Sequence, residues 1–396
     1  MNNNNPQFLQ VIVRVLPSLS LTDRLHLQET CRDLFTEIQH SPMSLMLKTN
    51  AAFSHSSSAL SLCLRFSNLY SLNIHVSHLP QLSPVLKTNS LRKLRVKGGM
   101  LSLSEITDLS THLRQLSITS PLSVLSIPLL MPLKNVLETL HLKQTLLGRR
   151  ELEMLLTLTH LTDVAVSTCI PNFNFTEWKK MKTLWISGQM QQNEPFDFPL
   201  SDRIRTLTIS SGSVSSTMLT TLHTLPNLTD LTLKHMNTDF AEPFALPHVR
   251  FLKLETFHVR LSQIRIHLPT ITHLSLWGPL RSSQIACVFN LPTLISLSLS
   301  WVDVAVWNER AYVMKAPLQR IKIMHSPTIP LNLLEAILKK GSVQTLIFHG
   351  LCQCKHIGIC LERVKWQKAS DSMLTGGSFQ LFKQTDGAWI WQRRQH

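Results

Sequence analysis

One short pattern, apolar-x-x-apolar-x-apolar, recurs through most of this chain and constrains its fold more than any other feature. Thirteen copies occur, from "LYSLNI" at 69–74 to "VQTLIF" at 343–348, and their central apolar residues lie 20 to 25 residues apart. A period of this length indicates a repeat architecture in which each copy is one structural unit. We therefore expect one elongated array over this part of the chain.

Within each copy, apolar and polar residues alternate, which is the pattern of a half-buried β-strand. In "LTDLTLKHM", Leu231 and Leu233 point to one side of the strand, and Thr232 and Lys234 point to the other. A single short strand cannot bury its apolar side alone. Neighbouring copies are therefore expected to stack into a parallel sheet with the leucines inward.

The segments between the strands predict short returns that are helical or irregular. Apolar residues spaced three and four apart predict helices at 149–157, 216–223 and 332–340. Recurrent Leu-Pro steps are expected to end the returns, because proline disfavours helical backbone in the residue before it. Strands alternating with helices place the chain in the α/β class.

This pattern resembles the leucine-rich repeat family over roughly residues 60–350, and we assign residues 46–350 to the repeat domain. The resemblance implies a solenoid with a parallel β-sheet on its concave face. The sequence departs from the family at one point, because the asparagine that the family often places five residues after the central position is missing from every copy. We therefore expect irregular loops after the strands.

The residues between the inward leucines would line the open face of the sheet. Many of these residues are Ser or Thr, but cations and tryptophans also occur, and tryptophan beside a cation is typical of a binding hot spot. The candidate target-binding residues are Lys93, Arg95, Lys97, His141, Lys143, Trp185 and Trp277. The alternative is an ordinary solvated sheet face with a few charges.

Composition limits the classes of function. The 396 residues carry a formal net charge of +15, which favours acidic or phosphorylated protein partners, and no nucleic-acid-binding motif accompanies it. No Walker loop, nucleophile elbow or zinc-protease motif occurs, so we expect a protein that is not an enzyme and needs no cofactor. No signal peptide or run of eighteen apolar residues is present, which predicts the cytoplasm or nucleus and no membrane partner.

The N-terminal 45 residues do not carry the repeat. They read as helical pieces, and in "LSLTDRLHLQETCRDLF" (19–35) the order Leu19, Leu21, Asp23, Leu25 and Leu27, followed by Cys31-Arg32, resembles the F-box. Leu34 stands where that family usually has tryptophan. The alternative for 1–45 is a plain helical cap on the solenoid.

The F-box resemblance implies the substrate-receptor subunit of a cullin-type ubiquitin ligase. Its N-terminal helices would bind the adaptor subunit through an apolar patch, while the repeats hold an acidic or phosphorylated target protein. The candidate adaptor-binding residues are Val11, Ile12, Val15, Leu19, Leu21, Leu25 and Leu27. The alternative is a leucine-rich-repeat interaction protein with no link to ubiquitin.

Residues 351–396 are expected to cap the last repeat. "SFQLFKQTDGAWIWQRR" predicts a β-hairpin that turns at Asp386-Gly387. Soft zinc ligands crowd into "CQCKHIGIC", namely Cys352, Cys354, His356 and Cys360. Four ligands within nine residues do not match the usual pair of separated knuckles, so buried or idle thiols are the favoured interpretation and no metal is assigned.

Overall fold

The fold comes from a computed structural model of the chain, which describes residues 43–46, 69–75, 86, 90–98, 111–119, 124–170, 172–188, 197–212, 214–236, 244–255, 266–278, 288–300, 315–325, 337, 342–349, 367–370, 373–376, 379–383 and 389–393. These residues belong to two compact units. Unit 1 runs to Ile170 and includes Phe175–Met181, and unit 2 contains the rest of the chain.

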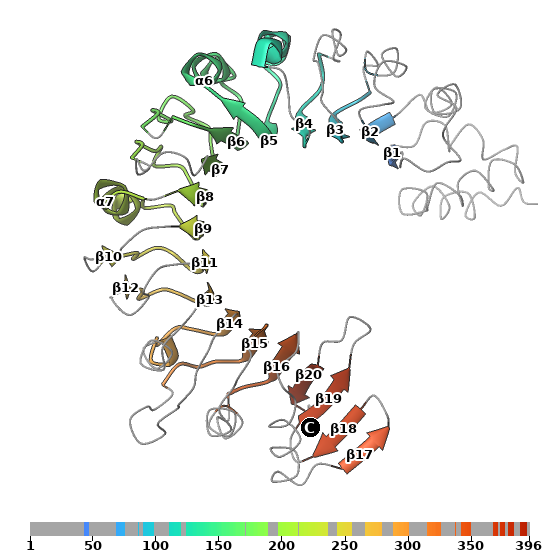
Figure 1. The fold of residues 1–396 in the computed structure, drawn as a ribbon, viewed down its shortest axis with the longest axis vertical. Coiled ribbons are helices and arrows are strands. Elements are labelled where there is room, and N and C mark those ends of the chain that lie inside the picture. Colours follow the sequence, from blue (N-terminus) through green and yellow to red (C-terminus); the bar gives the residue numbers. More distant parts are fainter. Residues whose placement is uncertain are drawn as a thin grey trace, which may run out of the picture. The chain divides into compact units, whose positions relative to one another are not determined.

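Unit 1 is built on parallel strands that pair in chain order. They are β1 (Met43–Met46), β2 (Leu69–His75), β3 (Lys93–Lys97), β4 (Gln115–Ile118), β5 (Thr139–Leu147) and β6 (Asp163–Thr168). In Figure 1 the labelled strands β2 to β6 follow one another. β1 was not expected from the sequence, and it spans the boundary predicted at residue 45.

Unit 2 repeats the same parallel arrangement. Its strands are β7 (Thr183–Gly188), β8 (Thr206–Gly212), β9 (Asp230–Met236), β11 (Phe251–Glu255), β13 (His273–Trp277), β14 (Ser296–Ser300), β15 (Arg320–Met324) and β16 (Thr345–His349). The sequence predicts thirteen strands from the repeat pattern, and all thirteen are present among the described residues, between β2 and β16.

The register of the strands confirms that the leucines point inward. Within each unit the central apolar residues stand directly opposite one another, as Leu94 pairs with Leu116 in unit 1 and Leu252 with Leu274 in unit 2. All three apolar positions of the pattern are buried; Leu113, Leu116 and Ile118, for example, are 0% exposed. Stacked parallel strands around a leucine-filled core are the architecture of a leucine-rich-repeat solenoid.

A ladder of hydrogen bonds joins successive repeats just before each strand. The carbonyl oxygen of Arg114 accepts from the backbone N–H groups of Glu138 and Thr139, at 2.8 and 3.0 Å. The same pair of hydrogen bonds recurs in unit 2, where the carbonyl of Thr272 accepts from the backbone N–H groups of Ile295 and Ser296, both at 2.9 Å. These bonds satisfy backbone groups that the irregular returns would otherwise leave unpaired.

Threonine hydroxyls strengthen this ladder. Thr293 Oγ1 donates to the carbonyls of Pro269 and Ile271, at 3.2 and 2.7 Å, and Thr270 makes the equivalent contacts one repeat earlier. The sequence lacks the asparagines that would bond to backbone groups after the strands. Threonines bond to backbone carbonyls at the opposite end, just before the strands. The loops after the strands lie mostly outside the described residues, so their irregularity stays a prediction.

The returns contain the helices that the spacing predicts, where they are described. They are α6 (Arg149–Leu156) and α7 (Ser216–Thr224), while of 332–340 only Ile337 is described, in helical backbone. Glu151 Oε2 accepts from the Gly148 N–H at 3.0 Å at the start of α6. A 3₁₀ helix, η6 (Val124–Leu133), and a short strand pair, β10 (Phe244–Ala245) with β12 (Ile266–His267), were not predicted.

The sheet of unit 2 ends in antiparallel strands. β16 pairs with β20 (Trp389–Arg393), which continues to β19 (Phe379–Lys383), β18 (Met373–Gly376) and β17 (Gln367–Ser370). β19 and β20 lie where the sequence predicts a hairpin, although Asp386-Gly387 is outside the described residues. Covering the edge of β16 satisfies its backbone groups, which a terminal strand of a solenoid requires. The division into domains at residues 45 and 350 stays a prediction.

Candidate functional site: a basic groove on the polar face of the sheet

The side chains that point away from the leucine core form one polar face in each unit. In unit 1, Lys93 pairs with Gln115, and Arg95 with Ser117, while the buried Leu94 lies between the two cations. Further along, Ser117 pairs with His141 on β5. The sequence prediction that these side chains share a face is therefore confirmed for Lys93, Arg95 and His141.

A groove of about 480 Å³ opens on this face of unit 1. We call it the basic groove, and its lining residues are Ser71, Lys93, Leu94, Arg95, Gln115, Leu116, Ser117, Thr119, Thr139, His141 and Lys143. Its lining residues come from the four neighbouring strands β2 to β5 and from Thr119 just after β4. Four of the seven predicted target-binding residues therefore meet in one hollow.

The chemistry of the groove is that of an anion-binding surface. Lys93, Arg95 and Lys143 are cations, and the remaining polar groups are hydroxyls, an amide and an imidazole. No carboxylate occurs among the described residues that line it. Neighbouring strands are spaced about 4.8 Å apart, and Lys143 stands two residues beyond the row that contains Arg95. The Cα atoms of Arg95 and Lys143 are therefore about 12 Å apart, and those of Lys93 and Lys143 about 16 Å.

Two of the residues that line the groove make contacts with neighbouring side chains. The Lys93 Nζ lies 5.4 Å from the centroid of the Tyr70 ring, within the range of a cation–π interaction. On the other side, His141 Nε2 and Asp163 Oδ1 are 3.1 Å apart, so the imidazole is hydrogen-bonded to a carboxylate that does not itself line the groove. The exposed Tyr70 was missed from the sequence because it precedes the alternating stretch.

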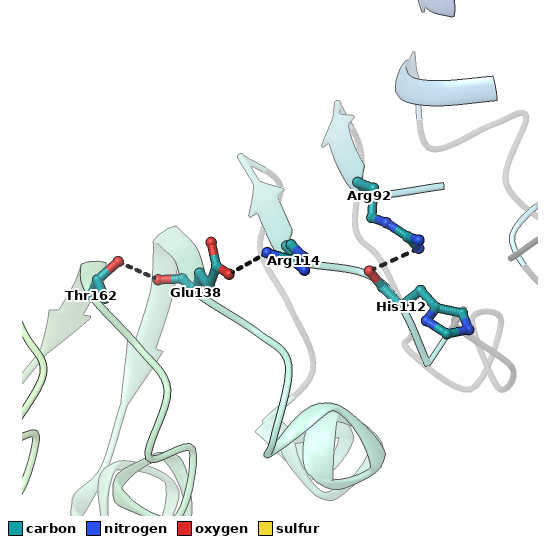
Figure 2. Close-up of polar contacts among 5 residues, drawn as sticks. All are labelled: Arg92, His112, Arg114, Glu138 and Thr162. Atoms are coloured by element: carbon teal, nitrogen blue, oxygen red, sulfur yellow. Dashed lines mark hydrogen bonds and ion pairs between the residues drawn. The ribbon is translucent and has the colours of Figure 1, made fainter. Parts of the chain in front are cut away.

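Other arginines of unit 1 are engaged between repeats, as Figure 2 shows. Arg92 donates to the carbonyl of His112 at 3.3 Å, and Arg114 forms an ion pair with Glu138 at 2.9 Å. The Thr162 hydroxyl donates to the Glu138 carbonyl at 3.2 Å. None of these side chains lines the basic groove. Arg92 and Arg114 thus link strand starts, whereas Lys93, Arg95 and Lys143 line the groove.

The other three predicted target-binding residues do not line the groove. Lys97 is exposed on β3 opposite His75. Trp185 and Trp277 are half-buried on the polar face of unit 2, but they stand in different rows and on strands β7 and β13. Four strand spacings, about 19 Å, separate these strands, so the two tryptophans do not form one cluster.

Two lysines in unit 2 share a buried acid. The Glu255 carboxylate, 5% exposed, is paired with Lys253 on its own strand and lies 3.9 Å from the Lys234 Nζ on β9. This carboxylate neutralises one of the two positive charges. Lys234 and Lys253 on this part of the face therefore already have an acidic partner within the protein.

An aromatic pair occupies the first outward position of two neighbouring strands in unit 2. The rings of Phe251 and His273 are stacked, with centroids 4.2 Å apart and an angle of 19° between their planes. Partial burial lowers the pKa of His273 below its ordinary value near 6.5, and the positive charge of Arg320 lowers it further, while the Asp230 carboxylate acts in the opposite direction. The ring is therefore uncharged at neutral pH.

The remaining predicted sites lie outside the described residues. These are the adaptor-binding set of residues 11–27 and the soft ligands Cys352, Cys354, His356 and Cys360. Within the described ranges, no three His, Cys, Asp or Glu side chains are grouped so that they could hold a metal ion. No helix in those ranges is long and apolar enough to span a membrane.

Comparison with known proteins adds one likeness. No family model matches the chain, and no curated protein matches it. Among solved structures, an internalin (inlF) from Listeria monocytogenes is similar over 65% of this chain and 81% of that chain, with 16% sequence identity and a TM-score of 0.38. This likeness is too weak to carry an argument, so function has to be inferred from the polar face itself.

Proposed function

We propose that this protein is a non-catalytic receptor that binds an acidic or phosphorylated segment of a target protein in the basic groove. The groove carries this proposal because Lys93, Arg95 and Lys143 converge there with no facing carboxylate among the described residues. Hydroxyls of Ser, Thr and the amide of Gln115 supply neutral donors for the oxygens of the same ligand. A stacked-repeat sheet is an architecture that suits protein partners.

The ligand class follows from charge and shape. An extended segment lying across the strands would place its anionic groups against Arg95 and Lys143, about 12 Å apart, a distance that about four residues span. Arginine can grip a carboxylate or phosphate with two parallel hydrogen bonds, and lysine adds a point charge. Attraction of this kind also accelerates encounter with an acidic partner.

The groove is tested by fluorescence anisotropy with labelled peptides. The probes are a peptide with four consecutive Asp and Glu residues, its phosphoserine counterpart, and a matched Asn and Gln peptide. The variant Arg95→Glu with Lys143→Glu should weaken binding of the anionic probes about 10- to 100-fold, because each reversal removes an attraction and adds a repulsion. The control is Lys179→Glu with Lys180→Glu, which makes the same change in charge at exposed residues of unit 1 outside the groove.

Affinity that falls equally in both charge-reversed variants would show that the groove is no specific site. Equal binding of the neutral peptide would contradict the proposal as well. Preference for the phosphoserine over the carboxylate probe would identify the modified target class.

We further propose that the N-terminal segment binds the adaptor of a cullin-type ubiquitin ligase, which would make the chain a substrate receptor. Support comes from the F-box-like order of Leu19, Leu21, Leu25 and Leu27 and from the neutral charge of residues 1–50 in a basic chain. The chain would act by proximity, holding a target near the ligase. This role places it in the cytoplasm or nucleus.

Co-purification of the full chain with the adaptor tests this second part. We expect retention by the wild type and loss in Leu25→Asp with Leu27→Asp, because charges in an apolar interface are costly. Gln28→Asp is the matched control and should bind. Absence of binding by the wild type, with peptide binding intact, would leave a leucine-rich-repeat interaction protein without a ligase link.

A further inference from the structure

The aromatic pair, Phe251 and His273, is an apolar feature on a face that is otherwise polar. Phe251 is 43% exposed, and Tyr70 of unit 1 is the other large hydrophobic residue exposed to this degree among those described. At the same first outward position the nearby strands carry Thr206, Asp230 and Ser296. The two stacked rings thus form a ridge among hydroxyl and charged side chains.

A single exposed phenylalanine is ordinary on a protein surface, so the ridge alone carries little weight. Its neighbours add the second observation. The row runs from Asp230 through Phe251, His273 and Ser296 to Arg320, so a negative charge lies on one side of the ridge and a positive charge on the other. Burial and the positive charge of Arg320 lower the pKa of His273, and the Asp230 carboxylate raises it, as expected for a ring that lies between these two charges in the row.

A second cation reinforces the positive side, because Lys322 lies two residues beyond Arg320 on β15. Arg250 adds an exposed cation at the ridge itself, just before Phe251. Lys253 is already paired with Glu255. No acid lies among the first outward residues of β13, β14 and β15. A partner that contacts the ridge from this side therefore meets an aromatic surface followed by Arg320, which forms no ion pair with any residue that the structure describes.

We propose that Phe251, His273 and Arg320 form a second docking surface, for an extended protein segment that packs an apolar side chain on the ring pair and points an acidic side chain at Arg320. Two to three strand spacings, about 10–14 Å, separate the rings from Arg320. Three or four residues of extended chain span that distance. The recognised feature is thus an apolar residue and an Asp or Glu three or four positions apart.

This surface lies in unit 2 and does not depend on the basic groove. Aromatic side chains and arginine are the residue types that carry most binding energy in protein interfaces. Covering the exposed part of the Phe251 ring with a leucine-sized side chain is worth about 1.4 kcal/mol, or tenfold in affinity.

A random heptapeptide library displayed on phage, selected on the full chain, tests the proposal. We expect enrichment of peptides with an apolar residue three or four positions from an acid. Their affinity, measured by anisotropy with synthetic copies, should fall at least tenfold in Phe251→Ser and in Arg320→Glu. Because both side chains are exposed, both variants should fold. Selection on Arg320→Glu should replace the acid with Lys or Arg.

Three results would overturn the docking surface. They are the absence of any such enrichment, enriched peptides that bind Phe251→Ser unchanged, and an acid preference that persists on Arg320→Glu. Peptides weakened only by Arg95→Glu with Lys143→Glu would reject the docking surface and support the basic groove. The reverse pattern would support the docking surface, whereas the groove is rejected only by the acidic-peptide measurement, so the two failures are distinguishable.

Discussion

The buried Trp178 side chain connects two successive returns in unit 1 by packing and by a hydrogen bond. Its replacement by phenylalanine tests how much this connection stabilises the repeats. The indole is 1% exposed, its Nε1–H donates to the carbonyl of Leu155 at 3.1 Å, and its ring lies 5.5 Å from that of Phe175. Leu155 belongs to the last turn of α6. One side chain therefore joins the end of a helix to the segment that leads to the following strand.

The cost of Trp178→Phe has two parts. The hydrogen bond contributes about 1 kcal/mol, and the Leu155 carbonyl keeps a second donor, the Leu158 N–H at 3.0 Å, so no buried acceptor is orphaned. The smaller ring removes about two buried carbons, worth about 1.6 kcal/mol at 0.8 kcal/mol each. A total near 2.5 kcal/mol corresponds to about 70-fold in an opening equilibrium.

Hydrogen exchange read by mass spectrometry measures this opening locally, which suits a chain of two units. Amides of α6 and of residues 172–181 should exchange about 70-fold faster in Trp178→Phe. The matched control is Trp185→Phe on the half-buried polar face, where we expect less than about fivefold in β7. Exchange of α6 within threefold of the wild type would refute the account of Trp178 as the residue that connects the two returns.

Three further predictions concern stability. Gly98→Ala should destabilise unit 1 by about 2 kcal/mol in urea unfolding, because φ is +79° and an added Cβ would meet the His75 ring; a loss below 0.5 kcal/mol would contradict this. Thr293→Val should cost about 1 kcal/mol through the lost hydrogen bond to Ile271, whereas an unchanged midpoint would show that the threonine ladder is dispensable. The pKa of His273 is lowered by burial and by Arg320, so the unfolded chain takes up a proton near pH 6.5 before the folded chain does, and stability should fall as pH drops below 6.5. Denaturation midpoints of His273→Gln should lack that part of the fall, and identical pH profiles would refute it.

The repeat strands could be predicted from the sequence because one physical rule decides them. Alternation fixes which side of each strand is buried, and thirteen copies of it specify the register, so the predicted row around Leu116 and Leu274 is confirmed. The helices at 149–156 and 216–224 follow from spacing of three and four in the same way. Local pattern and long-range packing agree in these segments, and such agreement makes them predictable.

Features that depend on pairing between repeats could not be predicted from one copy at a time. β1 was missed because its four residues, "MSLM", are too short to show a period. The threonine ladder depends on which carbonyl of the preceding repeat each hydroxyl meets, although the recurrent Leu-Pro-Thr and Leu-Pro-Asn steps are a signal that could have indicated it.

The candidate site was predicted only in part for the same reason. Lys93, Arg95, His141 and Lys143 were expected on one face, and the groove contains them. Lys97 and the two tryptophans were expected to join them, and they do not line it. Trp185 and Trp277 lie in unit 2 on strands four spacings apart, whereas Lys97 lies at the end of β3, two residues beyond Arg95. The stacking of Phe251 on His273 was missed because the ring pair forms across two repeats, about 20 residues apart in the chain.

Carbodiimide coupling of the acidic peptide to the full chain tests the central claim most directly, because it joins peptide carboxylates only to lysine amines that they touch. Peptide mapping by mass spectrometry then identifies the lysines. If the basic groove is the binding site, Lys93 and Lys143 should carry most of the coupled labelled peptide, and an excess of unlabelled peptide should displace the label from these two lysines. Equal coupling to the exposed Lys134, Lys179 and Lys180 would contradict the account.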